Sequence, residues 1–244
     1  MAEKIKPYEQ EGSKKEQVSK MFDNIAKRYD LLNRLLSLGI DQYWRRRAIK
    51  KLGQGSPKEI LDVATGTADV AIETAQRLQP ESIKGVDISK EMLAVGRVKV
   101  KKKGLQTVIE LLDGDSEALP FPDQSFDAIS VAFGVRNFEN LEKGLEEMHR
   151  VLRPGGQLVV LEFSQPHLFP FKQIYNFYFQ NILPLIGRIT SGDQRAYSYL
   201  YESVQAFPDG PAFKKVLQKI GFAQAEHTPL TLGVCAIYSG KKSA

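Results

Sequence analysis

Short apolar runs alternate with amphipathic segments through the middle of the chain. The runs have the length of strands buried on both faces, and they cover residues 60–64, 82–87, 108–112, 126–133 and 157–163. Residues 70–78, 91–102 and 141–152 show instead the three- and four-residue apolar spacing of helices. Strands that alternate with helices of this length predict an α/β fold with a parallel sheet and right-handed crossovers.

Two further helical regions and a strand pair flank this part. From about Ser13 to Leu52 apolar residues recur every three or four positions, and Gly53 to Pro57 has the composition of a linker. Near the other end, residues 211–220 predict a helix, and residues 223–228 and 234–239 predict a closing pair of antiparallel strands.

Between the fifth strand and the last helix the pattern fails, and aromatic residues gather. Residues 163–207 hold 11 of the 23 aromatics in the chain (13 Phe, 9 Tyr and 1 Trp). Two interpretations stay open, the packed core of an inserted helical cap and a pocket for a flat apolar substrate. We therefore expect a helical extension that contributes to the cap (1–54), a sheet core (55–164), an aromatic helical insert (165–210) and a closing part (211–244).

The first strand and its turn predict a ligand site. Open α/β sheets bind ligands at the carboxyl ends of their strands, and the first strand ends in Thr65-Gly66-Thr67, with Thr67 or Asp69 expected to cap the next helix. Asp87 ends the second strand about 20 residues later, where a carboxylate reaches ribose hydroxyls. The turn lacks the three glycines of a dinucleotide site and the Lys-Ser or Lys-Thr pair of a P-loop. S-adenosylmethionine, a nucleoside without phosphates, fits this pattern, and a turn that binds nothing is the alternative.

Composition narrows the class of protein. The chain has 244 residues, 42% of them hydrophobic, and a mean hydropathy of −0.29, as expected of a soluble globular protein. No apolar run approaches the ~18 residues of a spanning helix, and no signal-peptide core follows Lys4 and Lys6. The single Cys235 excludes an internal disulfide, and the three isolated histidines lack metal-ligand spacing. We expect a cytoplasmic, metal-free protein.

Two basic runs account for much of the net charge of +5. The lysines at 99–103 have no interleaved aromatic residues, which argues against a nucleic-acid track and favours a solvated helix end. Arg45 to Arg47 follow Trp44 outside the sheet, where they could meet anionic lipid.

Several of these segments resemble known proteins. Asp62, Gly66, Asp87 and the turn at 150–156 resemble class I methyltransferases that use S-adenosylmethionine. Residues 29–37, continuing to Trp44, and residues 150–164 are similar to the two signatures of the ubiquinone/menaquinone C-methyltransferase family, and residues 133–137 are similar to one of its loops. The resemblance implies a Rossmann-like, seven-stranded, mostly parallel, doubly wound sheet with an antiparallel C-terminal strand. It also implies methylation of a ring carbon of a polyprenylated quinol, demethylmenaquinol first and 2-methoxy-6-polyprenyl-1,4-benzoquinol as well or instead.

The chain departs from that family at several positions. Asp41 stands where the family usually carries a histidine, which removes a candidate base. Ala64 and Ala68 replace glycines, and Ala132 stands where many members have a serine. Asp115-Ser116 replaces an Asn-Ala pair on the adenine side of the cofactor.

The resemblance and the chain positions together assign roles. For the cofactor, Asp87 is expected to bind the ribose, Thr67 the methionine moiety, and Asp115 with Ser116 the adenine amino group. The turn residues Gly66 and Asp62 and the strand-end residue Ala132 complete the predicted cofactor site, with Asp62 either a contact or an organiser of the turn.

Four further residues are the expected catalytic groups. Arg136 and Asn137 are placed to hold the quinol oxygens, with Arg136 stabilising a phenolate. Asp30 and Tyr29 are candidates for taking or relaying the proton, and a helix cap bonded to backbone is the alternative role for both.

Other functions stay open at this point. One is an N- or O-methyltransferase of a soluble small molecule, and another is a non-catalytic cofactor-binding protein of the same fold. The aromatic insert favours the lipid quinol. A lipid substrate implies peripheral contact with the inner face of a membrane, whereas no nucleic-acid partner is expected and a homo-oligomer is compatible with the sequence.

Overall fold

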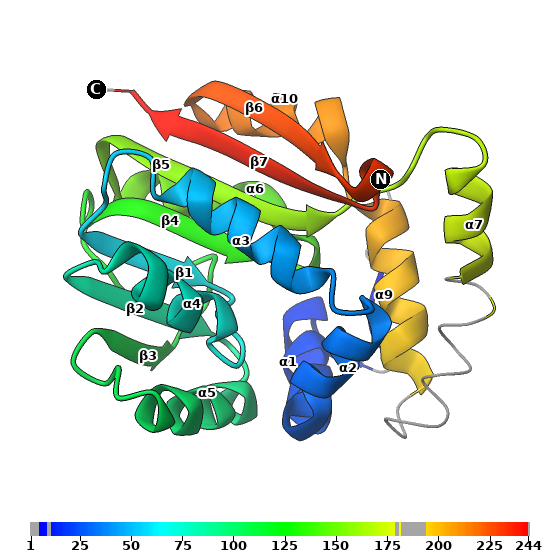
Figure 1. Cartoon of the computed structure of the whole chain (residues 1–244), viewed down its shortest axis with the longest axis horizontal. Coiled ribbons are helices and arrows are strands. Elements are labelled where there is room, and N and C mark those ends of the chain that lie inside the picture. Colours follow the sequence, from blue (N-terminus) through cyan, green and yellow to red (C-terminus); the bar gives the residue numbers. More distant parts are fainter. Residues whose placement is uncertain (1–4, 9–10, 179–180, 182–193, 244) are drawn as a thin grey trace.

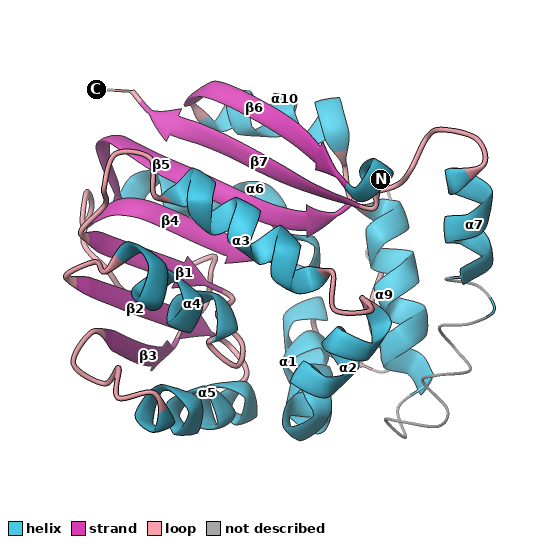
Figure 2. Ribbon diagram, in the orientation of Figure 1, coloured by secondary structure: helices cyan, strands magenta, loops and turns pink. Residues whose placement is uncertain are grey.

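A seven-stranded sheet runs through the computed structural model, which describes residues 5–8, 11–178, 181 and 194–243 (Figures 1 and 2). Its order is β3-β2-β1-β4-β5-β7-β6. The strands are β1 (Glu59–Val63), β2 (Ser82–Asp87), β3 (Ile109–Asp113), β4 (Phe126–Ala132), β5 (Leu152–Phe163), β6 (Phe222–Leu230) and β7 (Cys235–Lys242). The first five are parallel, while β7 is antiparallel to β5 and β6. The predicted doubly wound sheet and its closing antiparallel pair are confirmed.

Helices cover both faces of the sheet (Figure 2). One face carries α3 (Asp41–Leu52), α4 (Asp69–Leu78) and α5 (Lys90–Lys102). The other carries α6 (Leu141–Val151) and α10 (Gly210–Ile220). α3, which the sequence assigns to the N-terminal extension, therefore packs on the sheet as part of the core.

The two-residue period of the strands divides the core between these faces. In β1, Leu61 and Val63 join the cluster under α6 and α10, whereas Ile60 joins the cluster under α3 to α5. β5 repeats the pattern, with Leu158 on the first side and Val159 on the second. All five side chains are at most 1% exposed, as expected for central strands of a sheet covered on both faces.

The start of α4 differs from the expectation. Ala68 is its N-cap, in a left-handed conformation (φ 63°), and no side chain caps it. Thr67 and Asp69 do not cap because their side chains are bound elsewhere. The Thr67 hydroxyl donates to Asp30, and Asp69 pairs with Arg45. The predicted cap was therefore wrong.

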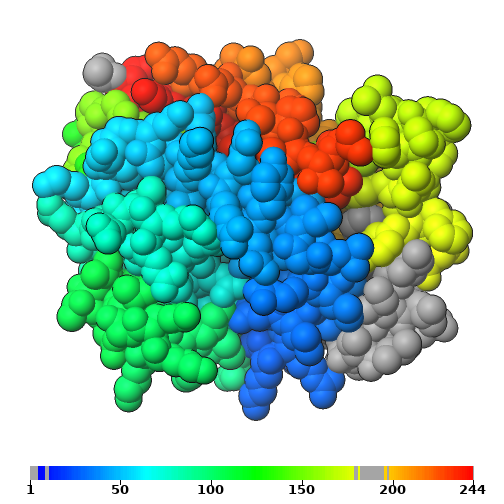
Figure 3. Space-filling model, in the orientation of Figure 1, coloured from blue at the N-terminus to red at the C-terminus, as the bar shows by residue number. Residues whose placement is uncertain are grey.

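A cap of four helices stands over the carboxyl ends of the strands. It is formed by α1 (Lys14–Ile25), α2 (Tyr29–Leu36), α7 (Phe171–Phe177) and α9 (Gln194–Ala206), with the turn η1 (Ala26–Arg28) joining the first two. Their shared apolar cluster contains Val18, Met21, Leu32, Tyr175, Ala196 and Tyr199. In the space-filling view the N-terminal segment, in blue, lies between the core and the insert (Figure 3). Segments far apart in the chain thus build one layer, although Phe179 and much of the insert lie outside the described residues.

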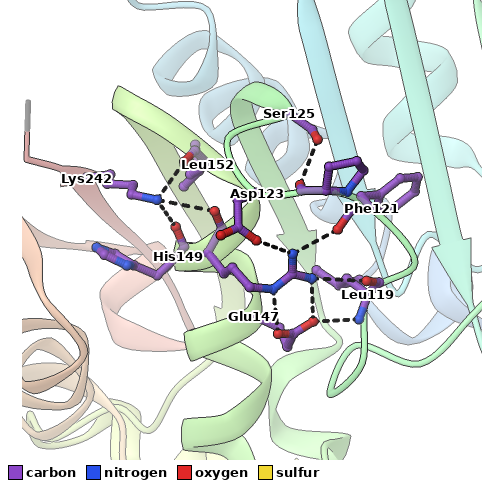
Figure 4. A network of polar contacts seen from close by, with 10 residues as sticks. Leu119, Phe121, Asp123, Ser125, Glu147, His149, Leu152 and Lys242 are labelled. Atoms are coloured by element: carbon purple, nitrogen blue, oxygen red, sulfur yellow. Dashed lines mark hydrogen bonds and ion pairs between the residues drawn. The ribbon is translucent and has the colours of Figure 1, made fainter.

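A polar network fixes the loop that leads into β4 (Figure 4). Arg150 of α6 donates to Glu147 and Asp123, at 2.8 Å each, and to the carbonyls of Leu119 and Phe121. Lys242 of β7 donates to the carbonyls of His149, Arg150 and Leu152, the last at 2.9 Å. Arg150, which begins the second signature, therefore has a structural role in this network.

Candidate active site

Two cavities open at the carboxyl ends of the parallel strands. The first is bounded by the turn after β1, by the ends of β2 and β4, by the loop after β3, and by α1. Five of the seven predicted cofactor residues line it, namely Gly66, Asp87, Asp115, Ser116 and Ala132. Residues that are 66 positions apart in the chain therefore meet in one cleft, because parallel strands end at the same edge of the sheet.

Asp87 joins the turn after β1 to the end of β2. Its Oδ2 accepts a hydrogen bond from the Gly66 N–H at 2.8 Å, and its Oδ1 accepts one from the Ser89 N–H at 2.9 Å. Burial raises the pKa of Asp87 to about 6, against the opposing effect of these N–H donors. The carboxylate is thus held rigidly at the wall of the first cavity.

The loop after β3 supplies the opposite wall. Asp115 Oδ1 accepts from the Glu117 N–H at 2.9 Å, and its Oδ2 is bound by Lys15 of α1. Lys15 and Val18 also line the cavity. α1 therefore closes the first cavity over the predicted adenine end.

Asp62 and Thr67 stand beside this cavity, not in its lining. Asp62 is buried and accepts hydrogen bonds from the hydroxyls of Thr65, at 2.7 Å, and Ser130, at 2.6 Å. Burial raises the pKa of Asp62 to about 6. Both Asp62 and Thr67 line a small adjoining cleft, which Arg45 also borders. Of the two roles open to Asp62, the geometry favours organising the turn.

The turn itself has a left-handed backbone at three positions. Ala64 (φ 54°), Gly66 (φ 56°) and Ala68 (φ 63°) all have positive φ angles. This explains why glycine suits the two alanine positions, since a Cβ atom makes the left-handed conformation unfavourable by ~1–2 kcal/mol.

The second cavity is larger and mostly apolar. It measures about 420 Å³ and lies among α1, α2, α7, α9 and the loop before β7. Phe22, Tyr29 and Phe133 line both cavities and form the wall between them. Phe133 packs on Phe163, with ring centroids 4.6 Å apart. The aromatic insert thus contributes both to packing and to a cavity.

Arg136 brings a buried charge to this apolar cavity. Its side chain is 7% exposed, and Nη1 donates to Glu162 Oε1 at 2.7 Å and to the Phe133 carbonyl at 2.5 Å. Its Cζ lies 5.4 Å from the centre of the Phe163 ring. Nε is buried and has no hydrogen-bond partner among the described residues.

Glu162 and Asn137 complete the surroundings of Arg136. Glu162 is fully buried, which raises its pKa, while Arg136 and the Phe163 N–H act in the opposite direction. Asn137 follows Arg136 but lines the first cavity, where its buried Oδ1 lacks a partner in the described part of the chain. The turn η2 (Val135–Asn137) therefore presents one polar side chain to each cavity.

Tyr29 and Asp30, the two candidates for proton transfer, lie in different surroundings. Tyr29 lies in the wall between the cavities, and burial raises its pKa. The Asp30 carboxylate points elsewhere, since it accepts from the Thr67 hydroxyl at 2.6 Å and pairs with Lys99 at 2.7 Å. Asp30 does not line either cavity. Asp41, at the histidine position, is buried and bound to Arg45.

Several important residues were not singled out from the sequence. Lys15 and Phe22 come from a helix whose spacing shows only that one face is buried. Glu162 lies within the second signature, which was the one available signal, and Tyr199 was only one of eleven clustered aromatics.

A doubly wound sheet of this order, with an acid at the end of β2 in the wall of a cleft, is the arrangement of a class I methyltransferase that uses S-adenosylmethionine. The chain is similar in fold to a putative S-adenosyl-L-methionine-dependent methyltransferase from Methanococcus maripaludis, with a TM-score of 0.61, 19% identity and 97% of each chain covered. The chain belongs to the ubiE/COQ5 methyltransferase family, whose model matches residues 10–242.

Curated relatives agree with this family over nearly their whole length. The chain is 52% identical over 240 residues to the demethylmenaquinone methyltransferase of Bacteroides fragilis, covering 98% of each. It is 49% identical over 232 residues to the ubiquinone/menaquinone biosynthesis C-methyltransferase UbiE of Geobacter sp. strain M21, covering 95% of this chain and 98% of that one. The predicted methyltransferase class, family and cofactor are confirmed.

Proposed function

We propose that this enzyme transfers the methyl group of S-adenosylmethionine to a ring carbon of a polyprenylated quinol, demethylmenaquinol in the first place. The observation that carries the proposal is the contact between the two cavities. A cofactor cleft meets an apolar cavity of about 420 Å³ at a wall of three aromatic rings, with Arg136 buried in the apolar side. The names of the relatives support a quinol, and the benzoquinol of ubiquinone biosynthesis is the second candidate ring.

The cofactor would lie along the first cavity. Asp87 would accept the ribose hydroxyls, and Asp115 with Ser116 would face the adenine. Gly66 and Ala132 leave room for the chain between nucleoside and sulfonium, while Asp62 would act through the turn. Thr67 is proposed for the methionine end because it lines the adjoining cleft. A cofactor held by these residues would have its methyl group near the shared wall.

The reaction requires a more nucleophilic ring carbon. Loss of a phenol proton gives the ring enolate character, and a phenol pKa of about 10 makes that loss unfavourable in neutral water. Arg136 cannot serve as the base, but its buried guanidinium would stabilise the phenolate oxygen beside the acceptor carbon. S-adenosylmethionine would supply an activated methyl group with a neutral thioether as its leaving group, and the methylated ring would regain aromaticity by releasing its C–H proton.

The positions of the candidates for proton transfer support Tyr29 over Asp30 in this proposal. Tyr29 is proposed to relay the phenol proton because it lies between the two cavities. Asn137 would orient the groups at the same wall from the cofactor side. Asp30 is the weaker candidate, because Thr67 and Lys99 already bind its carboxylate.

A direct assay tests the proposal. The protein, S-adenosylmethionine labelled on its methyl group and reduced demethylmenaquinol with one prenyl unit should give menaquinol with the label on ring carbon. Arg136→Met should keep cofactor affinity and lose turnover by ~100-fold or more, since one positioned oxyanion donor contributes ~10²–10³ to kcat. Label on oxygen, or transfer only to a soluble amine or alcohol, would favour the runner-up functions.

The mouth of the second cavity supports peripheral membrane contact. Its lining includes apolar side chains that are also solvent-exposed, namely Leu38 (79%), Ile174 (61%), Leu232 (56%), Ile40 (38%) and Phe171 (36%). We propose that these five residues, the apolar rim, enter the bilayer surface so that a prenyl tail passes directly into the cavity. No helix in the described residues has the length and apolarity needed to span a bilayer.

The basic part of the contact needs a correction. Arg45 is buried and bound to Asp41 and Asp69, so it does not face lipid. Arg47 is exposed and replaces it in the proposal.

The double variant Leu38→Ser, Ile174→Ser should sediment less with anionic vesicles than the parent protein, whereas Val98→Ser, at an exposed site on α5, should not differ. Equal sedimentation of all three proteins would refute the rim.

A further inference from the structure

The lining of the second cavity includes a tyrosine that the proposed mechanism leaves unused. Tyr199 on α9 is 1% exposed and lines this cavity. Its hydroxyl is buried without a hydrogen-bond partner in the described part of the protein. A buried hydroxyl with no partner lowers stability, and a phenylalanine of nearly the same shape would avoid that penalty. The presence of this hydroxyl is therefore best explained by a hydrogen-bond partner on a bound ligand.

Arg136 lies near this hydroxyl. α9 packs against η2, the turn that carries Arg136, and the Arg136 guanidinium lowers the pKa of the Tyr199 phenol against the larger effect of burial. Arg136 lines the same cavity, and its buried Nε is likewise unpartnered among the described atoms. Tyr199, Arg136 and Arg45, whose Nε is also buried without a described partner, thus each bring an unsatisfied donor to the lining of this cavity, and the first two lie on neighbouring elements.

The substrate class has two oxygens to match them. A quinol ring carries its oxygens on opposite sides, and only one of them lies beside the carbon that accepts the methyl group. We propose that Tyr199 donates a hydrogen bond to the second quinol oxygen, across the ring from the oxygen held by Arg136, and so selects rings with two oxygens. This subsite rests on the proposed function and extends it from quinol chemistry to a named specificity residue.

Other hydroxyls in the cavity provide a contrast. Tyr178 lines the same cavity, but its hydroxyl donates to the Leu36 carbonyl at 2.9 Å. The hydroxyl of Tyr178 therefore already has a partner, the last residue of α2. Tyr178→Phe removes a hydroxyl from the same cavity, of the same residue type, without removing the proposed contact, which makes it the matched control.

The test compares two substrates with two variants. One substrate is the prenylated demethylnaphthoquinol. The other is the matching naphthol, which keeps the tail and the oxygen beside the acceptor carbon and has hydrogen in place of the second oxygen. Tyr199→Phe should lower kcat/KM for the quinol about ten-fold and leave kcat/KM for the naphthol nearly unchanged. Tyr178→Phe should leave the quinol-to-naphthol ratio as it is in the parent enzyme. Thermal unfolding and cofactor titration establish that each variant is folded.

The outcomes separate this inference from the proposed function. Equal loss on both substrates would show a structural role for Tyr199 and overturn the subsite, as would no loss on either. Methylation of neither substrate by the parent enzyme would instead refute the proposed function and the subsite with it. Equal kcat/KM of the parent enzyme for the two substrates would also overturn the subsite, because the second oxygen would then contribute nothing to transition-state binding.

Discussion

The pair Arg136–Glu162 supports a quantitative prediction about one buried charge. The two side chains are 7% and 0% exposed, and their charged atoms approach to 2.7 Å. Glu162→Gln keeps the shape of the side chain and removes its charge. It also turns an NH₂ group toward donors, since the N–H groups of Phe163 and Arg136 both point at the carboxylate. The guanidinium would then remain buried without a counter-charge.

The magnitude follows from the geometry. Two unit charges about 4 Å apart attract by ~4 kcal/mol at an effective dielectric constant of 20. Removing one partner of a buried pair typically lowers the free energy of unfolding by ~3–5 kcal/mol. For a chain of 244 residues, this corresponds to a decrease in Tm of roughly 6–20 °C.

A double-mutant cycle is the decisive assay. Urea unfolding of the parent, Glu162→Gln, Arg136→Met and the double variant should give a coupling energy of about 3 kcal/mol or more, with the double variant more stable than Glu162→Gln alone. Glu162→Gln should also lower turnover, because the guanidinium loses the group that orients it. A coupling energy below ~1 kcal/mol would show that the pair is effectively solvated, and the argument for a phenolate site at Arg136 would fail with it.

Two further predictions concern the cofactor side. Asp87→Ala should weaken S-adenosylmethionine binding by roughly 10–100-fold in calorimetry while the protein stays folded, because hydrogen bonds to a carboxylate contribute ~1.5–3 kcal/mol; unchanged affinity would remove Asp87 from the ribose site. The free energy of unfolding should fall as the pH rises from about 4 to about 6. The raised pKa of Asp62 lets the folded state keep a proton over this range that the unfolded chain has lost. Asp87, whose pKa is raised in the same way, acts over the same range, so Asp62→Asn should reduce the slope by the share of one group, at most ~3 kcal/mol, and an unaltered slope would assign the dependence to other groups.

The sheet and most of its helices could be predicted because local signals agreed there. The buried run at β1 and the glycine of its turn gave strand and ligand edge together, and the closing strand pair followed from composition alone. The cap of α4 could not be predicted, since Thr67 and Asp69 look like capping residues until Asp30 and Arg45 arrive from other helices.

The partners of the side chains are the part of the site that the sequence does not predict. Position along the chain brought Gly66, Asp87 and Asp115 to one cleft, because strand ends are a property of topology. Whether a carboxylate is free or bound depends on contacts across the fold, and so Asp30 was ranked with Tyr29 although Lys99 neutralises it. The same holds for Arg45, whose burial no basic run in a sequence can show.

The position of α1 connects the two halves of the proposed reaction. Lys15 binds Asp115 at the predicted adenine end, while the neighbouring Lys14 donates to the carbonyls of Arg136 and Phe138 at 2.9 Å each. About two turns further on, Phe22 forms part of the wall between the cavities. A movement of α1 that admitted the cofactor would therefore also disturb the loop that carries Arg136. In the proposed reaction, closure of α1 over the cofactor cleft would therefore also complete the second cavity, and a closed site would keep water away from the reacting atoms.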